Sequence, residues 1–234
     1  MLGLATGITN TSYQWQPNMV GADLKLWLRN GVGVTVRQWD DSSGNANHIT
    51  QVTSGDQAAL AEGGLDFEGG EADHYDLTAN IAIASQEAFA VFLVMKVESY
   101  DSQNSILGTG DTDVLLEFQT DRRIRLKTAA GTDIIQYASN SFAAASKMLI
   151  SITRTSGGTG EWKVYKNGSL LSEDSTPTGD GNNTGAFTFN QVALRNDDRH
   201  FDGIIHEMLV YDTTDLTGSE VGKVNNYLLN KHNL

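Results

Sequence analysis

Apolar and polar residues alternate with a period of two along most of the chain. This alternation is typical of strands that bury one face, whereas amphipathic helices repeat their apolar positions about every 3.6 residues. The pattern predicts strands over residues 23–29, 88–97, 114–119, 123–127, 148–155, 161–166, 187–194 and 204–211. The chain is therefore predicted to be an all-β protein.

Two local signals add a turn and a helix to these strands. Residues 166–169 read Lys-Asn-Gly-Ser between two strand-like runs, and an Asn-Gly pair at this place predicts a type I′ hairpin, because both central residues must accept a positive φ. Thr217 and Glu220 fit the S/T-x-x-E capping box, and Val221, Val224 and Leu228 follow at helical spacing. We expect one helix here, packed against the strands.

The domain organisation predicted from the sequence is one large domain, residues 21–234, preceded by an arm, residues 1–20. The chain has two prolines and no linker-like stretch, and sandwiches of about 200–250 residues commonly form one domain. The arm lacks sustained alternation. Its apolar residues Leu2, Leu4, Tyr13 and Trp15 are candidate partner contacts, although the aromatic ones could equally dock on the domain itself.

Four segments, taken in order, resemble the LamG-like jelly-roll family of the concanavalin A-like lectin/glucanase superfamily. Residues 39–48 (WDDSSGNANH) resemble the W-x-D-x-S-G-N-x-N opening of the family, and residues 64–77 its F-x-G and D-Y-L pair. Residues 162–168 (WKVYKNG) and 201–211 resemble a family hairpin and the closing strand. The resemblance implies a concanavalin A-like antiparallel β-sandwich with one short C-terminal helix.

Composition excludes several kinds of chemistry and of partner. The chain has no cysteine, which rules out disulfides and thiolate metal sites, and its net charge of −13 disfavours direct nucleic-acid binding. The basic group at Arg122, Arg123, Arg125 and Lys127 reads as one face of a strand. Residues 1–20 have no Lys or Arg and no apolar run, so we expect no signal peptide, and no apolar segment reaches the ~20 residues of a membrane span.

No catalytic constellation stands out. Glucanases of this superfamily carry E-x-D-x-x-E on one strand, where two carboxylates attack and protonate the glycosidic bond. The nearest string, Glu71 to Asp76, ends in Asp and follows a Gly-Gly turn, so we interpret it as a solvated turn. No G-x-S-x-G elbow occurs and the five histidines are dispersed. The chain is predicted not to be an enzyme.

Weak binding candidates remain. Asp40, Asp41, Asn45, Asp197 and Asp198 could offer oxygens to calcium, although the turn that holds the first three is expected to be structural. No other cofactor is expected. Tyr100, Tyr137 and Phe142 could form sugar platforms, but such residues more often belong to the core.

Two functions fit these observations. Met1 to Thr11 and the absence of cysteine resemble virion proteins of bacteriophages, which assemble in the host cytoplasm. This resemblance implies a non-catalytic structural or decoration protein of a phage virion that contacts neighbouring virion subunits and copies of itself. The alternative is a carbohydrate-binding module or adhesin that recognises host surface glycans.

Overall fold

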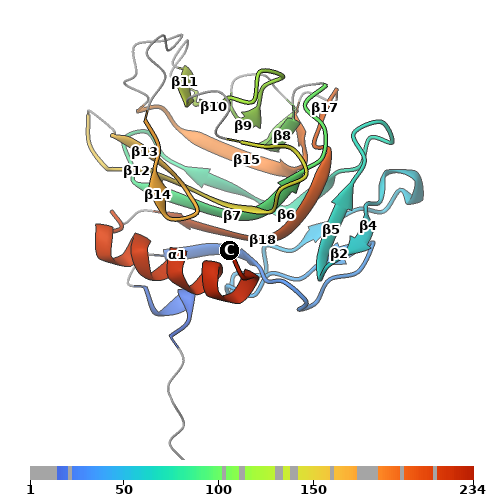
Figure 1. Ribbon diagram of the computed structural model, residues 1–234, viewed down its shortest axis with the longest axis horizontal. Coiled ribbons are helices and arrows are strands. Elements are labelled where there is room, and N and C mark those ends of the chain that lie inside the picture. The colour runs from blue at the N-terminus through green and yellow to red at the C-terminus, as the bar shows by residue number, and fades with distance from the viewer. Residues whose placement is uncertain are drawn as a thin grey trace, which may run out of the picture.

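The computed structural model describes residues 15–20, 23–101, 104–110, 114–129, 134–137, 142–158, 161–172, 184–195, 198–212 and 215–234, with only the backbone of 134–137. Two eight-stranded sheets stack face to face, and α1 (Gly218–His232) lies along the outer face of one of them (Figure 1). The strand pairs of the described residues are antiparallel. The predicted antiparallel β-sandwich with one C-terminal helix is confirmed.

The first sheet runs in the order β14-β13-β12-β7-β18-β5-β4, and β1 pairs with β18 beside this path. Its strands are β1 (Asp23–Leu28), β4 (Ala59–Ala61), β5 (Gly64–Phe67), β7 (Phe89–Val97), β12 (Met148–Arg154), β13 (Trp162–Lys166), β14 (Ser169–Leu170) and β18 (Gly203–Asp212).

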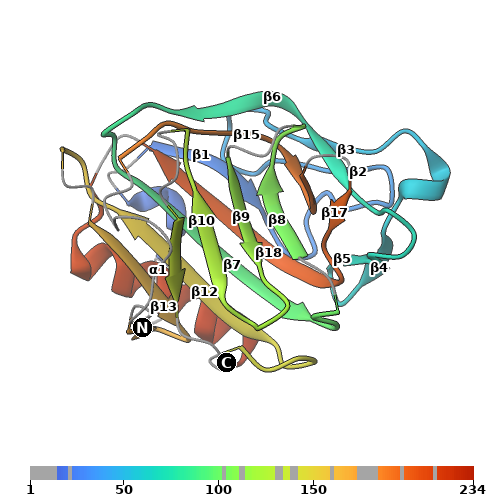
Figure 2. The same ribbon diagram turned by 90° about the horizontal axis from the view of Figure 1, so that it is seen from above.

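The second sheet runs in the order β11-β10-β9-β8-β15-β6-β3-β2. Its strands are β2 (Gln38–Trp39), β3 (Ile49–Thr50), β6 (Tyr75–Ile83), β8 (Asn104–Gly108), β9 (Leu115–Phe118), β10 (Ile124–Lys127), β11 (Ile134–Tyr137) and β15 (Phe187–Val192). Seen from above, β8, β9 and β10 lie across β7, β12 and β18 (Figure 2). A short pair, β16 (Leu194–Arg195) and β17 (Arg199–His200), and two 3-10 turns, η1 (Pro17–Met19) and η2 (Ser54–Asp56), complete the described elements.

The core between the sheets comes from alternate strand positions. On β10, Ile124 and Leu126 are buried, while Arg125 and Lys127 are half-buried on the opposite face. Arg125 and Lys127 therefore share one face of a strand, as the alternation predicted. The prediction is wrong for Arg122, which lies in the preceding turn with a φ of 64°.

Strand β7 is buried on both faces. Phe89, Val91 and Leu93 point into the core between the sheets, whereas Phe92 and Val94 pack in a second cluster with α1. A strand covered on both sides reads as a continuous apolar run rather than an alternating one. This explains the unbroken apolar sequence of residues 88–95.

Local signals fix the hairpin and the helix. Asn167 and Gly168 have φ of 47° and 77° and join β13 to β14, with Lys166 opposite Ser169, as predicted for a type I′ turn. At the start of α1, Thr217 and Glu220 form a reciprocal capping box. Val221, Val224 and Leu228 face the sheet and are buried. No described helix is long and apolar enough to cross a bilayer.

The described part of the predicted arm, residues 15–20, docks on the domain. The Tyr211 hydroxyl donates a 3.0 Å hydrogen bond to the Pro17 carbonyl, and the rings of Trp15 and Tyr227 meet edge to face at 6.0 Å between centroids. Trp15 thus contacts its own domain. Leu2, Leu4 and Tyr13 lie outside the described residues.

Candidate functional site

The turn of residues 40–48 fastens β1 to the second sheet. Asp41 accepts four hydrogen bonds: from the amides of Trp27 (2.9 Å), Ser43 (2.8 Å) and Asn47 (3.0 Å), and from the Ser43 hydroxyl (2.7 Å). Asn45 donates to the Leu24 carbonyl at 2.7 Å. These side chains satisfy backbone groups that no strand partner reaches, so the geometry favours a structural role for the turn.

The predicted calcium ligands are not gathered around one point. Asp41 and Asn45 make the bonds just described, and Asp40 lies beside His48, with 3.3 Å between Oδ1 and Nδ1. Asp198 forms a 3.7 Å ion pair with Arg199 in β17, and Asp197 lies outside the described residues. Calcium binding by these residues stays a prediction.

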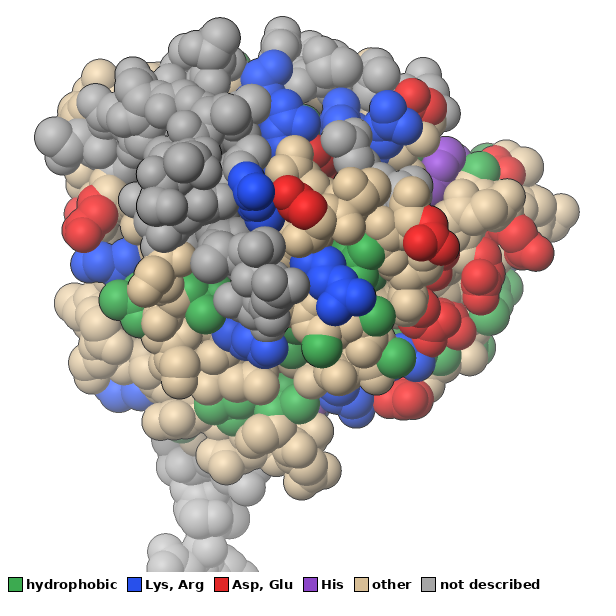
Figure 3. Space-filling model, turned by 45° about the horizontal axis from the view of Figure 1, so that its top comes forward, with side chains coloured by type: hydrophobic (Ala, Val, Ile, Leu, Met, Phe, Trp, Pro, Cys, Tyr) green, Lys and Arg blue, Asp and Glu red, His purple; other side chains and the backbone are tan. Residues whose placement is uncertain are grey.

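A different set of carboxylates does converge. Asp66 on β5, Glu68 just after it and Glu98 just after β7 bring their oxygens within 4.8 Å of one another. Burial and then the negative charge of Glu98 raise the pKa of Asp66. Lys96 forms an ion pair with Glu98 and supplies part of the counter-charge. Acidic side chains gather on the side of the molecule that carries β4 and β5 (Figure 3).

The Glu71–Asp76 string is not a pair of cleft carboxylates. Glu71 and Asp76 are exposed, as expected for a solvated turn, but Asp73 is 2% exposed. Its Oδ2 accepts a 2.9 Å hydrogen bond from the Glu68 amide, and burial raises its pKa. The expectation of a solvated turn is therefore wrong for Asp73, because a local backbone donor lets this carboxyl lie inside the fold.

The outer face of the second sheet holds a buried ion network. Glu117 on β9 is fully buried and accepts hydrogen bonds from Arg125 at 3.1 Å and from Arg195 at 2.9 Å. Lys and Arg side chains are visible over this side of the molecule (Figure 3). Glu117 neutralises part of the charge of Arg125 and Arg195, so we interpret the network as a structural connection between β9, β10 and β16.

Another buried carboxylate, Glu207, links β18 to β1 and α1. Its oxygens accept hydrogen bonds from the Trp27 indole at 2.8 Å and from His232 at 2.7 Å, and Oε2 forms a 2.7 Å ion pair with the Lys231 ammonium. Burial alone would raise the pKa of Glu207, but the bonds from His232, Lys231 and Trp27 together hold that pKa below its ordinary value. The charged side chain therefore fixes the C-terminal turn of α1 against the sheet.

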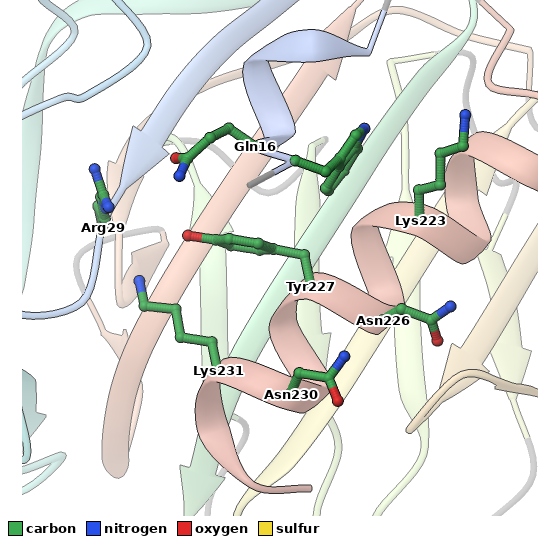
Figure 4. Close-up of a pocket in the computed structure, with 8 residues that line it drawn as sticks. Gln16, Arg29, Lys223, Asn226, Tyr227, Asn230 and Lys231 are labelled. Atoms are coloured by element: carbon green, nitrogen blue, oxygen red, sulfur yellow. The ribbon is translucent and has the colours of Figure 1, made fainter. Parts of the chain in front are cut away.

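Outside this carboxylate, the surface is hollowed between η1, the end of β1 and α1. This hollow, called here the α1 hollow, has a volume of about 670 Å³. It is lined by two aromatic residues, Trp15 and Tyr227, three amides, Gln16, Asn226 and Asn230, and three cations, Arg29, Lys223 and Lys231 (Figure 4).

The ring of Tyr227 is the centre of the hollow. It extends from α1 toward Arg29 (Figure 4) and meets the edges of Trp15 at 6.0 Å and of Trp27 at 6.3 Å between ring centroids. The Lys231 ammonium lies 5.7 Å from the centre of the same ring. Burial raises the pKa of the Tyr227 hydroxyl, which therefore stays protonated and able to donate a hydrogen bond.

Helical spacing explains why these side chains share one surface. Lys223, Tyr227 and Lys231 follow each other every four residues, so they stack along one side of α1. Asn226 and Asn230 lie next to this row and are exposed. The opposite side of the helix is used for packing on the first sheet.

The sequence did not reveal this site. Tyr100 and Phe142, considered as sugar platforms, are 8% and 0% exposed and pack against Phe118, while the side chain of Tyr137 is outside the described residues. One feature of the sequence could have indicated part of the site: Lys223, Tyr227 and Lys231 recur every four residues and so share one exposed side of the predicted helix. Nothing in the sequence indicated that Trp15 and Arg29 would meet it.

Two stacked antiparallel sheets with a helix on the outer face of one of them define a lectin-like β-sandwich domain. The chain belongs to the concanavalin A-like lectin/glucanases superfamily, whose Laminin_G_3 model matches residues 69–222. The resemblance noted from the sequence is thereby confirmed at the family level, although the turn of residues 39–48 lies outside the matched range. No curated protein sequence matches the chain.

Solved structures share the fold at low sequence identity. Domain 4 of AbnA, an extracellular arabinanase from Geobacillus stearothermophilus in complex with arabinotriose, is 18% identical with a TM-score of 0.60, over 87% of this chain and 98% of that one. Trypanosoma rangeli sialidase is 15% identical with a TM-score of 0.59, over 87% and 32%. The binding domain of Paraclostridial Mosquitocidal Protein 1 is 18% identical with a TM-score of 0.61, over 92% and 54%. This chain spans about a third of the sialidase and half of the mosquitocidal chain, so similar folds occur within larger proteins.

Proposed function

We propose that this domain is a non-catalytic carbohydrate-binding module that holds a glycan in the α1 hollow. The observation that carries the proposal is the combination of aromatic rings with exposed amides around one concave surface. Sugars present C–H faces that stack on rings and hydroxyls that need hydrogen bonds, so their sites combine these two kinds of side chain.

The lining of the hollow favours binding over hydrolysis. Glycoside hydrolysis uses two carboxyl groups, about 5 to 9.5 Å apart, on either side of the scissile bond. None of the described residues that line the hollow is Asp or Glu. Glu207, whose Oε2 lies 2.7 Å from the lining residue Lys231, is fully buried and already bonded to Lys231 and His232.

The similar structures support this proposal without naming the ligand. One of them, the arabinanase domain, is described with bound arabinotriose, and this chain covers 98% of it. Another is a toxin binding domain. A lectin-like domain whose hollow has no described carboxylate in its lining is compatible with a protein that binds a glycan and does not hydrolyse it. Fold alone does not determine function.

A glycan array with matched variants tests the proposal. The wild-type domain should bind at least one class of bacterial or plant polysaccharide, and Tyr227→Ala and Asn226→Ala should each weaken that binding by about tenfold, because each removes one stacking or hydrogen-bonding group. Asn80→Ala, on an exposed position of β6, is the control and should bind normally.

Three results would contradict the proposal. One is a wild-type domain that binds no glycan, and another is binding that both hollow variants retain in full. The third is release of reducing sugar from a bound polysaccharide, which would contradict the non-catalytic part. Because Asn226 is exposed, its variant keeps the test valid if Tyr227→Ala fails to fold.

A role in a phage virion is a second proposal. Residues 1–14 contain no charged side chain and include Leu2, Leu4 and Tyr13, a composition suited to contacts with neighbouring virion subunits or with copies of this chain. Sedimentation of the protein with purified particles would support it. A strictly monomeric protein that associates with no particle component would count against it.

A further inference from the structure

The charge of the α1 hollow differs from that of the rest of the molecule. The whole chain has 29 acidic and 16 basic residues, yet the charged residues that line the hollow are Arg29, Lys223 and Lys231, with no described Asp or Glu among them. In a strongly acidic protein, a concave surface with only positive charge attracts anions selectively.

Part of this charge is not neutralised by an ion-paired carboxylate of the described residues, although Arg29 lies beside the Tyr227 hydroxyl and the Lys223 charge lowers the pKa of Glu220. Lys231 forms a 2.7 Å ion pair with the buried Glu207. Arg29 and Lys223 have no carboxylate of the described residues within ion-pair distance, and Arg29 instead lies over the Trp27 ring, 5.0 Å from its centre. Residues 1–14, which precede Trp15, contain no Asp or Glu and cannot supply the missing negative charge.

Helix electrostatics account for only one of the three cations. Basic side chains in the last turn of a helix complement its dipole, and Lys231 is in the last turn of α1. Lys223 is near the opposite end of the helix, and Arg29 follows β1 rather than belonging to the helix. Arg29 lies over the Trp27 ring and Lys223 is one helical turn from Glu220, but no lining carboxylate of the described residues neutralises either charge inside the hollow.

We propose that the α1 hollow selects an anionic saccharide, with Arg29 or Lys223, which lie at its two ends on either side of the Tyr227 ring (Figure 4), receiving a sugar carboxylate or sulfate. The inference rests on the proposed function, because it specifies which glycans the same site prefers. A guanidinium matches the two oxygens of a carboxylate or sulfate group with two parallel N–H donors. Asn226 and Asn230 also line the hollow, where their amides extend to the side of α1 away from Arg29 (Figure 4) and suit neutral hydroxyls of the same saccharide.

Calorimetric titration with three matched trisaccharides tests this preference: a neutral galactose trimer, the corresponding galacturonate trimer and a sulfated galactose trimer. At least one acidic trimer should bind about tenfold more tightly than the neutral one at low salt. The difference should shrink as ionic strength rises, because Arg29 and Lys223 act on an accessible charge. The acidic trimer that binds more tightly identifies the anionic group.

Charge-removing variants locate the effect. The double variant Arg29→Gln with Lys223→Gln should weaken binding of the acidic trimer about tenfold more than binding of the neutral trimer, and so lose the acidic preference, whereas Lys163→Gln, on β13, should keep it. If the double variant does not fold, Lys223→Gln alone should reduce the preference at least threefold. Equal binding of acidic and neutral trimers, or a preference unchanged by these variants, would overturn the inference and leave the proposed function standing. Binding of no glycan of any class would overturn both.

Discussion

The Trp27 indole donates a 2.8 Å hydrogen bond to the carboxylate of Glu207, a residue 180 positions further along the chain. The bond joins the first strand to the last one at the base of α1. Because Lys231 and His232 meet the same carboxylate, one buried charge connects three elements.

Replacing Glu207 with Gln should destabilise the domain. Gln keeps the shape but leaves Lys231 and His232 without their buried counter-charge, and breaking a buried pair in this way typically costs about 3 kcal/mol of unfolding free energy. Urea unfolding followed by tryptophan fluorescence measures the loss. Glu161→Gln, which breaks a 3.2 Å pair between exposed side chains, is the control and should change stability by less than about 0.5 kcal/mol.

The same carboxylate also predicts acid sensitivity. Its bonds hold the folded-state pKa of Glu207 below the ordinary 4.5, so its contribution is present above that pH and is lost as the pH falls further. Acid unfolding of Glu207→Gln should consequently depend less steeply on pH below about 4.5. An unchanged dependence would contradict this role for Glu207.

His206 should make stability depend on pH in a higher range. Burial, followed by the nearby charge of Lys147, lowers its pKa to about 4, and neither ring nitrogen has a hydrogen-bond partner. Between pH 6.5 and 4 the unfolded chain therefore binds a proton that the folded chain excludes, and stability decreases by about 2–3 kcal/mol as the pH falls through this window.

Unfolding free energies measured across this window test the assignment. His206→Gln should flatten the decrease, whereas His48→Gln, at a partly exposed histidine, should retain it. A decrease that persists in full without His206 would assign the proton to another group.

Asp41→Ala should cost about 2–3 kcal/mol, because it leaves the amides of Trp27, Ser43 and Asn47 without their acceptor. If the turn is structural, the loss measured by thermal unfolding will be equal in calcium and in EDTA. Calcium that stabilises the wild type but not Asp41→Ala would instead support the metal site predicted from the sequence. Glu71→Gln, at an exposed carboxylate outside this turn, is the control and should behave like the wild type in both buffers.

Residues whose partners are near in the sequence were predicted well. The Asn167–Gly168 turn and the Thr217–Glu220 capping box depend on contacts within a few residues, so their sequence signals are complete. The strand of residues 89–97 was also predicted, but its burial on both faces depends on α1, more than 120 residues later.

The candidate site could not be predicted, because its parts come from opposite ends of the chain. Trp15, Arg29 and Tyr227 have no shared motif, and they meet because β1 pairs with β18, α1 packs on the first sheet and Tyr211 bonds to Pro17. The burial of Asp73 could not be predicted for a similar reason. It depends on a hydrogen bond from the Glu68 amide, and the spacing of residues in the sequence did not indicate this bond.

Because Trp15 and Tyr227 are 212 positions apart and touch, the hollow cannot exist on a growing chain until residue 227 has left the ribosome. A glycan held between these two ends would act as a clamp on both. It would protect η1 and α1 together from fraying and from proteases, and recognition would be restricted to molecules that had finished folding.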